Sequence, residues 1–167
     1  MFYIYQRLLV LFVFLTASCS LFAQSEQGNV SGMTQARMAK IVAKVAGEYE
    51  GSSNHIQFVF NEVPMALISD AASNRMRIIA PVAEVSNLTD AHIKAAMVSN
   101  FHLALDARYA IGNGMMFAAY IHPMKELTDQ QLESAISQVS TLRLTFGTKY
   151  TSGALTFGGR NPEEQDI

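Results

Sequence analysis

The side chains with the clearest potential for chemistry are soft metal ligands late in the chain. Met116, His122 and Met124 lie within a stretch of nine residues. Thioether sulfur and imidazole nitrogen both bind Cu(I), so these three side chains could hold a soft metal ion. Methionine is also common in irregular cores and adaptable binding surfaces, because its side chain is unbranched and flexible. The sequence therefore leaves a Cu(I) site as the alternative to ordinary packing, which is the leading interpretation.

The other reactive side chains argue against an enzyme. The chain has four histidines, and none belongs to an H-E-x-x-H zinc motif. In a helix, the second histidine of a zinc-ligand pair would lie four residues after His92. That position is occupied by Ala96. No Gly-x-Ser-x-Gly motif supplies a nucleophilic serine. Asp70, Asp106 and Asp129 occupy predicted turn or cap positions. We therefore predict a protein without catalytic residues and without a cofactor.

Length and charge narrow the class further. The 167 residues suit one domain and a leader, since domains usually contain about 100–150 residues. The formal net charge is -2 and the chain has no Lys/Arg cluster. Neutralisation of phosphates supplies most of the affinity for nucleic acids, so we expect no nucleic-acid partner.

The N-terminus is typical of an export signal. Arg7 precedes the unbroken apolar run Leu8–Leu15, which is too short to span a bilayer, since spanning takes about 20 residues. Small residues follow, and a cleavage after Ala23 would release the mature chain. We predict a signal peptide at 1–23 and a periplasmic or secreted bacterial protein. An uncleaved membrane anchor is the alternative.

Cys19, the single cysteine, adds a second route to the membrane. The run Leu15-Thr16-Ala17-Ser18-Cys19 is similar to a bacterial lipobox, although Thr16 stands where that pattern has an aliphatic residue. Lipidation of Cys19 is therefore an alternative to ordinary cleavage. Contact with a membrane is expected only if Cys19 is lipidated or the leader is retained. If Cys19 is removed, the mature chain can form no disulfide.

Hydrophobic periodicity predicts one α+β domain at 33–146, between a flexible spacer at 24–32 and a flexible tail at 147–167. A first helix starts near Thr34 and carries an apolar stripe as far as Tyr49. Alternating residues then predict three strands, a helix capped by Thr89, a hairpin around Gly112–Gly114, and a helix that begins with the capping box Thr128–Gln131. The expected fold is an antiparallel five-stranded sheet with three helices, in the order α-β-β-β-α-β-β-α.

This order resembles the fold of type III secretion chaperones and of the YbjN-like domain family. The resemblance is densest in residues 97–142, where a helix ends near Asn100, a hairpin follows at 107–121, and a His-Pro-Met-x-x-Leu-Thr segment occupies 122–128. It implies a small α+β domain that often dimerises and binds other proteins without catalysis. Secretion chaperones are cytoplasmic and markedly acidic, whereas this chain carries an export signal and is nearly neutral. The sequence therefore indicates an exported, divergent member.

The second helix and the last strand are the predicted contact surface for a protein partner or a second copy. Small residues beside aromatic ones allow close approach of another element, and packing under the third helix is the alternative explanation. We predict a non-catalytic, chaperone-like or adaptor-like module that forms a homodimer and binds a protein partner; a periplasmic Cu(I)-binding protein is the alternative. The predicted contact residues are Met97, Phe101, Met116, Ala118 and Tyr120, and the predicted core residues are Phe58, Phe60, Met76 and Phe117.

Overall fold

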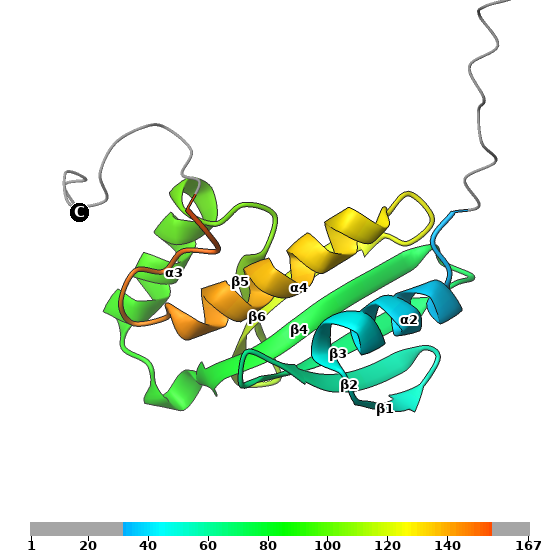
Figure 1. The fold of residues 1–167 in the computed structure, drawn as a ribbon. Coiled ribbons are helices and arrows are strands. Elements are labelled where there is room, and N and C mark those ends of the chain that lie inside the picture. The colour runs from blue at the N-terminus through cyan, green and yellow to red at the C-terminus, as the bar shows by residue number, and fades with distance from the viewer. Residues whose placement is uncertain (1–31, 155–167) are drawn as a thin grey trace, which may run out of the picture. The chain divides into compact units, whose positions relative to one another are not determined.

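The computed structural model describes residues 32–154, which form helices and one antiparallel sheet (Figure 1). The sheet has six strands in the order β1-β2-β3-β4-β6-β5. The described elements are α2 (Gln35–Ala46), β1 (Tyr49–Ser52), β2 (His55–Phe60), β3 (Val63–Asp70), β4 (Arg75–Glu84), the 3-10 turn η2 (Val85–Asn87), α3 (Asp90–His102), β5 (Arg108–Gly112), β6 (Met115–Pro123) and α4 (Asp129–Leu144).

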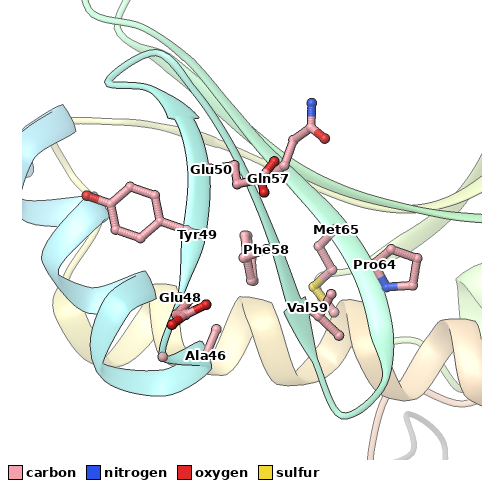
Figure 2. A pocket seen from close by; sticks show the side chains of 10 residues that line it. Ala46, Glu48, Tyr49, Glu50, Gln57, Phe58, Val59, Pro64 and Met65 are labelled. Atoms are coloured by element: carbon pink, nitrogen blue, oxygen red, sulfur yellow. The ribbon is translucent and has the colours of Figure 1, made fainter.

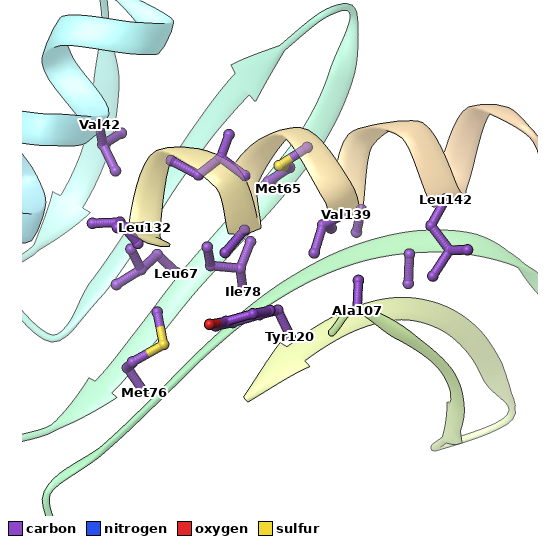
Figure 3. Packing of buried hydrophobic residues seen from close by; sticks show 14 of the residues in the cluster. Val42, Met65, Leu67, Met76, Ile78, Ala107, Tyr120, Leu132, Val139 and Leu142 are labelled. Atoms are coloured by element: carbon purple, nitrogen blue, oxygen red, sulfur yellow. The ribbon is translucent and has the colours of Figure 1, made fainter. Parts of the chain in front are cut away.

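The core lies between one face of the sheet and helices α2 and α4. Helix α4 contacts β3, β4, β5 and β6, and α2 contacts β1, β2 and α4 (Figure 1). Every second residue of the strands points to these helices, because side chains alternate between the two faces of a strand. Ile78 pairs with Tyr120, and both lie beneath α4 (Figure 3). Ala80 pairs with Ala118 on the same two strands, and all four side chains are buried.

The α+β class is confirmed, whereas the predicted five strands and their order are wrong. The extra strand, β1, follows α2 directly and makes the order α-β-β-β-β-α-β-β-α. Helix α2 ends at Gly47, whose φ of 82° leaves the helical region. Tyr49, predicted as the last residue of the helical stripe, therefore starts a strand and pairs with Phe58.

The turn into β2 depends on Gly51. Its φ is 110°, a backbone conformation that other residues rarely adopt. A Cβ atom at this position would lie 2.1 Å from the carbonyl oxygen of His55, so any side chain would clash with the facing strand.

The predicted core is right for one face of the sheet and wrong for Phe117. Phe58 and Met76 are buried, and Phe60 is half-buried against them. Phe117 is half-buried on the opposite face, where it pairs with Ala110 of β5. Strand β6 is apolar on both faces, so its own sequence does not specify which face lies beneath the helices.

Predicted caps are confirmed at two helices. The Thr128 hydroxyl accepts a hydrogen bond from the Gln131 N–H, and the Gln131 side chain accepts one from the Thr128 N–H, which completes the capping box. Thr89 caps α3 in the same way, with His92 as the reciprocal partner. These bonds define where α3 and α4 begin.

Residues 147–154, assigned to a tail from the sequence, pack near the ends of α3 and α4. The Ser99 hydroxyl donates to the Tyr150 carbonyl, and the Leu105 N–H donates to the Ser152 hydroxyl at 2.7 Å. Residues 155–167 lie outside the described residues, as do 1–31 with the predicted signal peptide and Cys19. Within 32–154, no helix combines the length and the hydropathy needed to cross a bilayer.

Two leucines of α4 allow a test of the core. Leu142 is fully buried and Leu144 is 55% exposed. We expect Leu142→Ala to lower the free energy of unfolding by about 3 kcal/mol, because it leaves a cavity. Leu144→Ala removes the same atoms from the surface, so we expect a loss below about 1 kcal/mol. Urea titrations measure both values, and equal losses would contradict the assigned packing of α4.

Candidate protein-binding surfaces

The predicted contact residues divide between the surface and the core. On α3, Phe101 is 77% exposed and Met97 is 46% exposed. They are four residues apart and therefore lie on the same side of the helix. Met116, Ala118 and Tyr120 are instead buried. They alternate along β6 and share the face on which Tyr120 lies beneath α4 (Figure 3). Their side chains therefore belong to the core of the domain, which leaves Met97 and Phe101 as the exposed part of the predicted surface.

The three candidate copper ligands do not come together. Met116 and His122 are six residues apart on the extended strand β6, which corresponds to about 20 Å. Met116 and Met124 are both buried in the core. The His122 ring stacks on Tyr120 and its Nδ1 donates to the Pro123 carbonyl at 2.7 Å. One ion cannot contact both ends of this set. The described residues also contain no group of three His, Cys, Asp or Glu side chains placed to bind a metal.

Asn100 links α3 to the edge strand β5. Its side-chain amide donates to the Tyr109 carbonyl at 3.1 Å, and its side-chain oxygen accepts from the Tyr109 N–H at 2.7 Å. These two bonds reproduce what one residue of a neighbouring strand would supply. The edge of the sheet is therefore closed at Tyr109, beside the exposed Phe101.

Tyr109 itself is held in place by contacts with the end of α4 and with the residues that follow it. Its hydroxyl donates to the Leu142 carbonyl at 2.7 Å, and its ring contacts those of Phe146 and Tyr150 with centroid distances of 5.5 and 6.1 Å. Burial raises the pKa of the Tyr109 hydroxyl, because an ionised phenolate would lose solvation. The neutral hydroxyl thus stays available as a donor to the last turn of α4.

The buried amide of Gln138 fixes the loop that leads into β5. Its Oε1 accepts hydrogen bonds from the backbone N–H groups of Asp106 and Ala107 at 2.9 and 3.1 Å, and its Nε2 donates to the Ser134 hydroxyl. Gln138 is not among the residues predicted from the sequence. A glutamine among the apolar positions of an otherwise amphipathic helix is the signal that could have found it.

The other edge of the sheet carries a groove. A hollow of about 1030 Å³ lies where α2 runs into β1 beside the β2–β3 hairpin (Figure 2). The apolar side chains that line it include Tyr49, Phe58, Val59 and Met65, and Glu48 and Glu50 add two carboxylates. Strand β1 pairs only with β2 within the described sheet, so its outer backbone edge is open beside the groove.

An open strand edge beside an apolar groove can bind an extended peptide. The strand edge offers main-chain hydrogen bonds, and the groove offers room for alternate side chains. Because Glu48 and Glu50 are both negative, the groove favours a segment that contains Lys or Arg. The groove is not among the sites predicted from the sequence, because it depends on β1, which the residue pattern did not indicate.

Comparison with known proteins identifies the fold as that of type III secretion chaperones. The structure of the Yersinia pestis type III secretion chaperone SycH with a stable fragment of YscM2 matches with a TM-score of 0.52 and 11% identity, over 68% of this chain and 100% of that chain. The ExsC–ExsE complex matches with a TM-score of 0.50 and 15% identity, over 65% and 90%. The predicted resemblance to these chaperones is confirmed for the fold; the resemblance to the YbjN-like family stays a prediction.

No protein-family model matches the sequence. No curated protein matches it either.

The closed edge at Tyr109 can be tested through Asn100. We expect Asn100→Ala to lower the free energy of unfolding by about 1–2 kcal/mol and to speed hydrogen exchange of the Tyr109 amide, because both bonds are lost. Asn100→Asp keeps the acceptor for that N–H and should preserve more of its protection at neutral pH. Unchanged exchange at Tyr109 in Asn100→Ala would show that the side chain does not close the edge.

Proposed function

We propose that this chain is an exported, non-catalytic protein-binding module of the chaperone or adaptor type. The observation that carries the proposal is the groove beside β1, where an open strand edge meets the apolar side chains of Tyr49, Phe58 and Met65. Such an arrangement suits an extended protein segment better than a small substrate. The complexes with a similar fold give indirect support, since SycH holds a fragment of YscM2 and ExsC is found with ExsE.

The chain forms a homodimer through α3 in this proposal. Met97 and Phe101 are large apolar side chains exposed on one side of that helix, and solvent exposure of such residues is unfavourable in a monomer. Ile111, 50% exposed, is a further exposed apolar side chain on β5, the strand that α3 contacts. Export is proposed from the sequence of the leader, with Arg7 followed by Leu8–Leu15.

The dimer is tested by changing its central side chain. We expect the mature chain to have the mass of a dimer in light scattering and Phe101→Asp to have that of a monomer, because a carboxylate would be buried in the contact. Ile121→Asp places the same charge on another exposed apolar position, and it should remain dimeric. A wild-type chain with the mass of a monomer would contradict the homodimer.

The groove is tested by capture of its partner. Tagged mature chain and its Tyr49→Ser variant are incubated with the envelope fraction of the source cells, and bound proteins are identified by mass spectrometry. We expect one protein to be retained by the wild type at moderate salt and lost with Tyr49→Ser, since the change removes an aromatic wall of the groove. Phe101→Asp should still retain this protein if the groove and the dimer contact are separate. Equal retention by wild type and Tyr49→Ser would exclude the groove as the binding site.

A further inference from the structure

The face of the sheet opposite α2 and α4 is uncovered within residues 32–154 (Figure 1). An antiparallel sheet with one solvated face normally alternates apolar and polar residues, so its outward positions should be polar. Here they are mostly apolar. We name this surface the outer sheet face; its apolar residues are Val59, Pro64, Ala66, Ile68, Ile79, Pro81, Ala110, Phe117, Ala119 and Ile121.

The outer sheet face is contiguous rather than scattered. Ala66, Ile79 and Ala119 are directly paired across β3, β4 and β6. Ile121 at one end is 67% exposed, and Val59 on β2 is 56% exposed. A contiguous apolar surface of this kind marks an interaction site in a soluble protein.

At the end of this face that contains Ile121, two arginines lie on β4. Arg77 lies between Ile68 and Ile121, its cross-strand partners, at a hollow of about 230 Å³ that Arg75 and Asp70 also line. The Asp70 carboxylate already accepts hydrogen bonds from the Ala72 N–H and from the Ser73 N–H and hydroxyl. The Arg75 guanidinium donates to the Asn74 carbonyl at 3.1 Å, so Arg77 is the cationic group that we assign to a ligand at this hollow.

The shape of the face suits a helix. On the covered side of the same sheet, α4 packs Leu132, Ile136 and Val139 against the strands. On the outer side, the small residues Ala66 and Ala119 flank Ile79, their common cross-strand partner, so a helix can approach the backbone closely on either side of Ile79. A helix seated there would place its flank beside Arg77.

We propose that the outer sheet face binds an amphipathic helix of a partner protein whose apolar stripe is bordered by Asp and Glu. This surface is separate from α3 and requires neither the homodimer nor export. It is a second proposed site, next to the groove at β1, and Val59 and Pro64 line both sites. The groove is proposed to bind an extended segment that contains Lys or Arg, whereas the outer sheet face is proposed to bind an acidic helix.

The test uses a designed helical peptide of about 18 residues, long enough to form a helix in water. It carries leucines at i, i+3, i+4 and i+7 with glutamates on both borders; a second peptide has lysine at every glutamate position. Fluorescence anisotropy of labelled peptide measures affinity for the mature chain.

We expect the glutamate peptide to bind at least about tenfold more tightly than the lysine peptide, because only its borders complement Arg77. Arg77→Glu should reverse this preference, and Ile121→Ser should weaken binding about tenfold.

Several results would overturn the proposal. Phe101→Asp, which leaves the outer sheet face intact, must bind like the wild type, and Arg77→Gln must reduce the preference without changing the urea midpoint. Absence of saturable binding, or equal affinity for both peptides, excludes an acidic helix as the ligand.

Other results would assign the outer sheet face to a different occupant. Binding that appears only after removal of residues 155–167 assigns the face to the chain's own segment. Retention of the wild type but not of Arg77→Glu on phosphatidylglycerol vesicles, without peptide binding, assigns it to a membrane surface. A dimer mass lost in Ile121→Ser assigns it to a second copy.

Discussion

The pairing of β4 with β6 is the interaction on which the rest of the domain depends. It joins the β2–β4 meander to the β5–β6 hairpin, two parts of the chain separated by α3. The register that places Ile78 beside Tyr120 also aligns the apolar surface over which α4 packs. Helix α2 then contacts α4 and β2, and the loop into β5 is fixed by Gln138 of α4. The groove at β1 and the surface of α3 beside β5 therefore both depend on the central β4–β6 pairing for their positions.

Local patterns were sufficient for much of this fold. The caps at Thr89 and Thr128 follow from side chains close to the groups they bind, and the alternation in β2 to β4 follows from one apolar and one more polar face. Strand β1 was missed because Tyr49 continues the spacing of the α2 stripe. Gly47 ends the helix two residues earlier, which a count of apolar spacing does not register.

The candidate site was harder to predict, because its residues are defined by contacts between distant segments. The run Met115–Tyr120 is apolar on both faces, and only pairing with β4 determines that Met116, Ala118 and Tyr120 face α4 while Phe117 faces outward. On α3, Met97 and Phe101 belong to an apolar side of the helix, which would ordinarily face the core; their exposure follows only from the position of α3 in the fold. Asn100 was noted as part of a family pattern; its role at Tyr109 required the position of β5.

The two edges of the sheet are chemically unequal, and this bears on stoichiometry. A sheet with two free edges can add a strand on either side, and repeated addition leads to open-ended polymers. Here the amide of Asn100 occupies the outward backbone groups of Tyr109 on β5, whereas β1 keeps its outward edge unpaired. Strand addition is thereby directed to β1. An open-ended array of copies, in which β1 of one copy pairs with β5 of the next, is therefore disfavoured by the Asn100 side chain.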